Sequence, residues 1–177
     1  MRILLISLAL LAGVVAGVAT AGVSATMELR ARESSAVVGM RAFVSRCIPG
    51  IASGEGIVTT GLRQTSAETR AAVLKGRKGG VWVSSEYEML LIAFEDAPVC
   101  RVMIPVVDPA VVSDLVLGVF REQEGLFRLE RFNFGELGGM NAVYSSKDNE
   151  RRLVIRISTG TGEGGSGFAL LSVERTL

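Results

Sequence analysis

The alternation of apolar and polar residues is clearest in the middle of the chain, where two apolar runs flank a turn. The first run covers Met89–Phe94 and the second covers Val99–Ile104. The segment Glu95–Pro98 between them contains a proline, which cannot join a central ladder and therefore marks a turn. The second run stops at Pro105. This pattern predicts a β-hairpin around which the rest of the fold is built.

A helix is predicted upstream of this hairpin. Apolar residues recur at helical spacing from Ala36 to Cys47, and either Ser34 or Ser35 can cap the start of the helix. The pair Pro49–Gly50 predicts that the helix stops there, and a glycine-punctuated loop is expected as far as Thr60.

Two further helices are indicated by capping signals. Thr65 and Glu68 have the spacing of a capping box, and Gly76 is placed to end the helix that follows. Asp108 and the proline after it predict the start of an amphipathic helix that reaches about Glu124. Its apolar stripe indicates that it packs on a sheet.

Beyond this helix the period changes from helical to alternating, which predicts an antiparallel meander. The expected strands are Phe127–Phe134, Asn141–Ser146, Arg152–Ser158 and Phe168–Glu174. A glycine-rich segment before the last strand contains the G-x-G-x-x-G spacing at Gly160, Gly162 and Gly165. A strand pattern follows it, whereas a dinucleotide site needs a helix there, so we interpret the segment as a hairpin loop.

The predicted fold is therefore a single α+β domain, an antiparallel sheet with two or three helices packed on it, covering residues 36–177. Residues 22–35 are expected to form a polar tether. Residues 1–21 have one charge at Arg2 and an apolar core at Ile3–Ala12, which predicts a secretory signal peptide. Small residues allow cleavage after Ala21, which we prefer, or after Ala25. The alternative is an uncleaved anchor, because no charge falls between Arg2 and Glu28.

The two cysteines, Cys47 and Cys100, are both downstream of this leader. An even count in an exported protein suggests a disulfide. Such a bridge would pin the first helix onto the second strand of the central hairpin. A redox pair is the less favoured alternative, because the close Cys-x-x-Cys spacing is absent.

Charge excludes some classes of partner. Cleavage removes one arginine from the 19 basic residues and none of the 18 acidic residues, so the net charge of the processed chain is zero. Nucleic acid is not expected as a partner, and no membrane span is expected after cleavage. A dense basic cluster at Lys75–Gly80 is interpreted as a solvated turn, with anion binding as the alternative.

The chain contains no histidine, which removes histidine-based triads and most zinc and iron sites. No catalytic residue, metal site or cofactor is predicted. Glu86 and Glu88 would share one face of an extended strand, and their convergence with Asp96 in a pocket would favour a carboxylate enzyme. A solvated strand face is the preferred interpretation.

Four arginines form the one candidate site that we single out from the meander. The third predicted strand places alternate apolar residues on one face and arginines on the other. The candidate anion-binding residues are Arg128, Arg131, Arg152 and Arg156. An ordinary sheet face, with its charges offset by Glu130, Glu150 and Glu174, is the favoured alternative.

The order of leader, short helix ending in Cys47, glycine-rich middle and Cys100 in a strand before a helix resembles small exported proteobacterial proteins of uncharacterised function. The resemblance covers residues 36–120. It implies export to the periplasm or beyond and supports the Cys47–Cys100 bridge. We therefore expect a binding or envelope-associated module, with an envelope component or another protein as partner. A histidine-free enzyme using carboxylates or arginines on a small substrate is the alternative.

Overall fold

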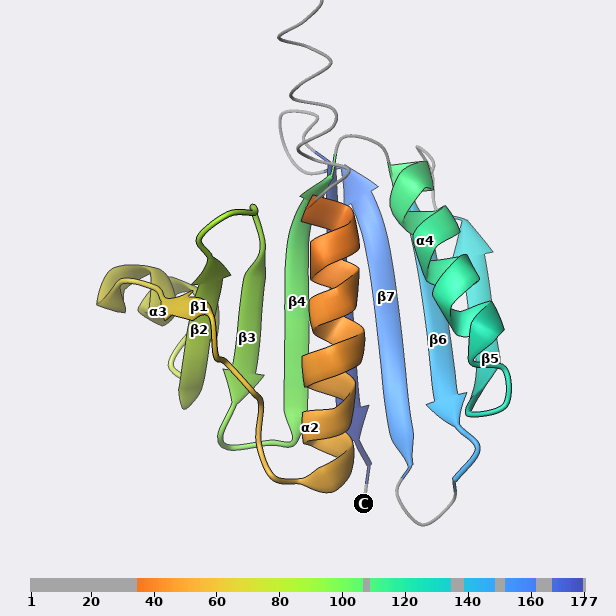
Figure 1. Ribbon diagram of the computed structural model, residues 1–177, viewed down its shortest axis with the longest axis horizontal. Coiled ribbons are helices and arrows are strands. Elements are labelled where there is room, and N and C mark those ends of the chain that lie inside the picture. The colour runs from red at the N-terminus through yellow and green to blue at the C-terminus, as the bar shows by residue number, and fades with distance from the viewer. Residues whose placement is uncertain (1–34, 107–108, 135–138, 149–151, 162–166, 177) are drawn as a thin grey trace, which may run out of the picture. The chain divides into compact units, whose positions relative to one another are not determined.

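The alternating apolar segments assemble into one eight-stranded sheet in which every neighbouring pair is antiparallel. The computed structural model describes residues 35–106, 109–134, 139–148, 152–161 and 167–176. The expected leader, most of the tether, Asp108 and the centre of the glycine-rich loop lie outside these residues. Within them, the α+β prediction is confirmed (Figure 1).

The strands follow the order β1-β2-β3-β4-β8-β7-β6-β5, so the C-terminal strand lies in the middle of the sheet. The predicted central hairpin is present, and so is the meander. The strands are β1 (Leu62–Gln64), β2 (Gly79–Ser84), β3 (Leu90–Phe94), β4 (Val99–Val106), β5 (Phe127–Phe134), β6 (Met140–Ser146), β7 (Leu153–Thr161) and β8 (Gly167–Arg175).

Strand β4 does not stop at Pro105 as predicted. Its pairing with β3 ends at Met103, while its pairing with β8 continues through Pro105 to Val106. Pro105 therefore lies where β4 has a partner on one side only, which is a position where a sheet tolerates proline.

The first helix is longer than the Pro49–Gly50 pair predicted. Residues 35–42 are α-helical, a π-helical turn η1 follows at Phe43–Cys47, and α2 (Ile48–Ser53) carries the helix on to Gly54. The amide of Ile48 donates to the carbonyl of Phe43, the wide spacing of a π-turn. Pro49 thus lies in the first turn of α2, where its missing N–H is tolerated. Gly54, with φ at 77°, ends the helix.

The other two helices lie close to their predicted positions. Helix α3 (Ala67–Leu74) begins one residue later than the Thr65 box implied, because Ser66 is the cap and its hydroxyl accepts the amide of Thr69. Helix α4 covers Pro109–Glu122. Its Phe120 ring stacks on Tyr144 of β6 at 4.3 Å between centroids, which docks α4 on the sheet.

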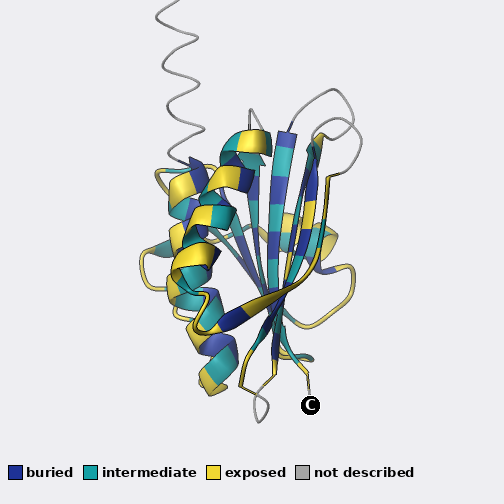
Figure 2. Ribbon diagram, turned by 90° about the vertical axis from the view of Figure 1, so that its right-hand side faces the viewer, coloured by how far each residue is buried: buried dark blue, intermediate teal, exposed yellow. Residues whose placement is uncertain are grey.

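The helices divide unequally between the two faces of the sheet. The helix at 35–53 and α4 cover one face, and their inward residues form the main core with residues of β4, β8, β7 and β6 (Figures 1 and 2). On the opposite face, α3 is the one described helix that makes a core contact, through Leu74 with Val81 and Ile92. Much of that second face is consequently covered by no helix that the structure describes.

The predicted disulfide is confirmed. Cys47, at the end of η1, is bonded to Cys100 in β4, and the two Cα atoms are 5.4 Å apart. Both side chains are fully buried. The bridge therefore joins the first helix to the middle of the sheet, as the positions of the two residues suggested.

Candidate functional site

The face of the sheet opposite the two long helices carries an apolar groove at one end. Its floor consists of residues of β2, β3, β4 and β8 whose side chains point to this face. Cross-strand partners share a face of a sheet, and the registers pair Leu90 with Met103 and Pro105 with Phe168. Val83 of β2 extends the same surface. These five residues are half-buried, so they form an apolar floor that is open to solvent.

The turn between β2 and β3 forms one wall of the groove. Ser84 orders this turn, because its hydroxyl accepts the amides of Glu86 and Tyr87 at 3.2 and 3.3 Å. The exposed side chains of Glu86 and Glu88, together with Arg63 of β1, make the lining charged at its outer edge. The groove is open to solvent and has a volume of about 820 Å³. That size falls within the usual range for small-molecule sites.

The groove exists because α3 covers only the other end of this part of the sheet. Leu74 of α3 packs on Val81 and Ile92, and Leu90 and Phe94 contact the edge of this small cluster. Nothing equivalent covers Met103 or Phe168 within the residues that the structure describes. The sequence signal for the groove was weak, because alternation predicts which residues share a face but not which face a short helix leaves open.

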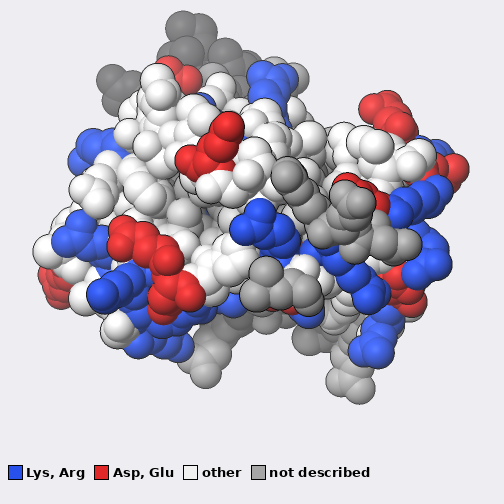
Figure 3. Space-filling model, turned by 90° about the horizontal axis from the view of Figure 1, so that it is seen from below, with Lys and Arg blue, Asp and Glu red and all other residues white. Residues whose placement is uncertain are grey.

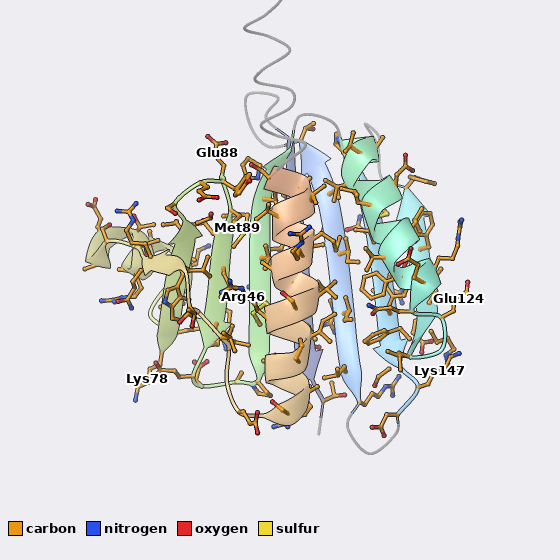
Figure 4. All side chains as sticks on the ribbon, in the orientation of Figure 1. Arg46, Lys78, Glu88, Met89, Glu124 and Lys147 are labelled. Atoms are coloured by element: carbon orange, nitrogen blue, oxygen red, sulfur yellow. A yellow bond between two sulfur atoms is a disulfide. The ribbon has the colours of Figure 1, made fainter. Side chains whose placement is uncertain are left out.

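The carboxylates that we considered for catalysis do not meet. Glu86 and Glu88 lie in the β2–β3 turn and not on an extended strand, so the shared strand face that we considered is wrong. Asp96 lies in the turn at the other end of β3. Figure 4 shows Glu88 and Lys78 at opposite ends of these strands, and Asp96 is on the Lys78 side, where Glu95 bonds the Lys78 carbonyl.

One side chain of the basic turn, that of Arg77, is engaged in contacts within the chain. Arg77 binds Asp96 through two nitrogens, at 2.7 and 3.3 Å, and its guanidinium lies 3.8 Å from the centre of the Phe94 ring. The hydrogen bond from Arg77 lowers the pKa of the Asp96 carboxyl below its ordinary value. This end of the molecule mixes basic and acidic side chains (Figure 3). The preferred interpretation of a solvated turn fits this arrangement.

The four candidate arginines are partly neutralised by neighbouring acids. Arg128 binds Glu130 at 2.8 Å, and Ser145 also donates to Glu130. The hydrogen bonds from Ser145 and then Arg128 lower the pKa of the Glu130 carboxyl, and the charge of Arg152 adds to the effect. Arg156 forms an ion pair with Glu174 of the neighbouring strand. Arg131 is exposed on the edge strand β5. Glu130 and Glu174, two of the three acids predicted to offset these arginines, are therefore the actual partners of Arg128 and Arg156.

Sequence reasoning missed a fifth arginine on the same face. Arg131 pairs with Val143, Val143 with Arg156, Arg156 with Ser172, and Ser172 with Arg101 of β4. Arg101 and Arg156 thus line one polar cleft of about 330 Å³, together with Asn141, Ser158, Ser172 and Glu174. The available signal was a charged residue inside the otherwise apolar run Val99–Ile104.

Two negative findings concern the residues that the structure describes. No group of three or more histidine, cysteine, aspartate or glutamate side chains that could hold a metal ion is found among them. Nor does any helix within the described ranges combine the length and apolarity needed to cross a membrane. Both cysteines that could have served as nucleophiles are consumed by the disulfide.

Comparisons with family models, with curated proteins and with solved structures found no match for this chain. The resemblance to small exported proteobacterial proteins therefore stays a prediction. The groove, the arginine-bearing face and the disulfide are the features from which a function can be inferred.

Proposed function

We propose that this protein is an exported, non-catalytic binding protein, and that the apolar groove between the β2–β3 turn and Phe168 is its ligand site. One observation carries the proposal. A sheet face with half-buried apolar residues, hollowed into an open groove of about 820 Å³, lies beside exposed charges. Apolar lining with a few polar groups is typical of sites that bind small molecules.

Export is supported by two independent features. Residues 1–21 have the charge and apolar pattern of a secretory leader. The buried Cys47–Cys100 bridge is typical of proteins that fold outside the reducing cytosol. These two features support the assignment to the periplasm or the exterior. Fractionation of cells, followed by mass spectrometry of the N-terminus of the protein in each fraction, tests the assignment.

A binding role is favoured over catalysis by the arrangement of ionisable groups. Glu86 and Glu88 are both exposed, and Asp96 is engaged with Arg77 at the far end of β3. General acid and base catalysis needs a carboxylate whose pKa is raised by burial or by a like charge. Among the described residues, the carboxyl groups with a resolved change are those of Asp96 and Glu130, and both have lowered pKa values instead.

The direct test is titration of the purified protein with the fluorescent apolar probe N-phenyl-1-naphthylamine. We expect saturable binding by the wild type. Met103→Lys places a charge on the groove floor and should weaken binding at least about tenfold. Val154→Lys is the matched control, because Val154 is half-buried on the same face but lies at the other end of the sheet. Equal probe affinity in the two folded variants would contradict the proposal.

A further inference from the structure

The apolar groove and the polar cleft adjoin each other on the sheet face opposite the two long helices. Met103 of the groove floor pairs with Leu170, which lines the cleft. The next residues on this face of the same two strands are Arg101 and Ser172, which pair with each other and also line the cleft. Alternate residues of a strand share a face and are roughly 7 Å apart, so one small molecule can contact Met103 and Arg101 together.

Arg101 is a half-buried cation without an acidic partner. Its guanidinium lies 5.2 Å from the centre of the Phe94 ring, against which Arg77 also packs. Arg77 binds Asp96, whereas Arg101 forms no ion pair within the described part of the chain, and its buried Nε has no hydrogen-bond partner there. Charged groups that are withdrawn from water are normally paired. The Arg101 side chain is therefore suited to an anionic group from outside the chain.

The other charges of the cleft offset each other. Glu174 lines the cleft and forms an ion pair with Arg156, so the described lining has two positive side chains and one negative side chain. The excess positive charge is that of Arg101. Ser172 lies between Arg101 and Arg156 across the strands, and its hydroxyl can donate a hydrogen bond to an anion held at Arg101.

The outer edge of the groove has the opposite sign of charge. Its exposed charged side chains are those of Arg63, Glu86 and Glu88, one positive and two negative. An anionic group is repelled at this edge and attracted at Arg101. The floor between the two ends is apolar and suits an uncharged body. The charges therefore select both the class of ligand and its direction along the groove.

Resting on the function proposed above, we infer that the ligand is an organic anion, an apolar molecule that ends in a group of anionic oxygen atoms such as a carboxylate or a sulfonate. Its apolar body lies on the groove floor at Met103 and Leu170. Its anionic group is bound by the Arg101 guanidinium and the Ser172 hydroxyl. A neutral molecule of the same shape fits the floor but lacks the charge-assisted hydrogen bonds at Arg101, so it binds more weakly than the anion.

The test compares two fluorescent probes that have the same ring body. N-phenyl-1-naphthylamine is neutral, and 8-anilinonaphthalene-1-sulfonate is the same molecule with a sulfonate group. Each is titrated into the purified wild type and its variants, and the ratio of the two dissociation constants is compared. A change in the floor alone alters both constants, whereas a change at the anion site alters the ratio.

Arg101→Gln should weaken binding of the sulfonate about tenfold and change binding of the neutral probe by less than about twofold. Ser172→Asp places a carboxylate beside Arg101 and should have the same effect, while it keeps the contact of Arg101 with Phe94. Arg131→Gln is the matched control, because Arg131 is exposed on the same face but lines neither the groove nor the cleft. It should leave the ratio unchanged.

Circular dichroism checks that each variant is folded, and Ser172→Asp decides the matter if Arg101→Gln does not fold. A ratio that is the same in the wild type and in the folded Arg101 and Ser172 variants overturns the inference. An equal change in Arg131→Gln, which would show a general effect of surface charge, also overturns it. In both cases the proposed ligand site stands if the neutral probe still binds and Met103→Lys weakens that binding. Failure of the wild type to bind either probe contradicts the proposed function itself.

Discussion

Cys47 and Cys100 are 53 residues apart in the chain but 5.4 Å apart at their Cα atoms, where the first helix packs along β4 in the centre of the sheet. Both are fully buried in the main core. A bridge across so long a segment restricts the unfolded chain strongly, and the chain-entropy relation gives a stabilisation of about 4 kcal/mol.

We therefore expect the double substitution Cys47→Ala and Cys100→Ala to lower the free energy of unfolding by about 2–5 kcal/mol. The measurement is urea unfolding under non-reducing conditions, followed by circular dichroism. Wild type unfolded in the presence of a reductant is the control and should lose a similar amount. Two free thiols in the exported wild-type protein would contradict the bridge itself.

Gly39 and Gly118 provide a second, internally controlled prediction, because both lie inside helices but in different surroundings. A Cβ at Gly39 would overlap the side chain of Ile104, which is fully buried and would have to shift within the packed core, whereas a Cβ at Gly118 has open space. Gly118→Ala should stabilise by about 0.5–1 kcal/mol. Gly39→Ala should destabilise by about 1–3 kcal/mol through overpacking. Thermal unfolding measures both, and equal shifts of the same sign would be inconsistent with the close helix approach.

The Arg77–Asp96 pair predicts how one carboxyl group titrates. The hydrogen bond from Arg77 lowers the pKa of Asp96 in the folded state. This hydrogen bond therefore stabilises the fold fully above the ordinary pKa of the unfolded chain, and the stabilisation is lost as the pH falls through the lower pKa of the folded state. Arg77→Gln should raise the pKa of Asp96 toward the ordinary value. Carboxyl-carbon NMR titration measures this shift. Glu130 is the internal control, since its partners Ser145 and Arg128 are untouched.

The arginine-bearing face predicts a small effect on stability. The Arg156–Glu174 pair is partly exposed, with 52% of the arginine side chain accessible, and pairs of this kind contribute about 0–1 kcal/mol. Replacing Arg152 and Arg156 with serine should therefore change the free energy of unfolding by about 1 kcal/mol or less. Retention on an anionic resin, compared between wild type and variant at low and high salt, tests the anion-binding hypothesis separately. Identical salt-dependent retention would leave this face without a ligand role.

The sequence predicts those elements of the fold that are indicated by the pattern of neighbouring residues, and it does not predict features that lack such a pattern. The bounds of Phe127–Phe134 were predicted to the residue, because apolar and polar residues alternate on either side of the bulge between Leu129 and Arg131, although only Phe127 is buried. The three-residue strand β1 (Leu62–Gln64) was not predicted, since so short a segment has no period. The helix through Pro49 was misjudged because a π-turn precedes the proline, and no residue pattern in the chain indicates that turn.

The site was harder to predict than the fold for the same reason. The pairing of β4 with β8 brings Pro105 beside Phe168, which are 63 positions apart, and no local pattern specifies that neighbour. Nor did any pattern indicate that α3 would stop short of Met103. Of the residues considered for chemistry, Glu86 and Glu88 do line the groove, but as exposed groups at its edge and not as a paired acid and base.

The place of β8 in the sheet has a consequence for how the protein reaches its folded state. Strand β8 follows the other seven strands in the sequence, and it joins β4 on one side to β7 on the other. Until residues 167–175 pair, the strand groups β1–β4 and β5–β7 have no strand between them, and each presents an unpaired edge. The two halves of the sheet can therefore form separately, but they become one hydrogen-bonded sheet only when β8 pairs with both β4 and β7.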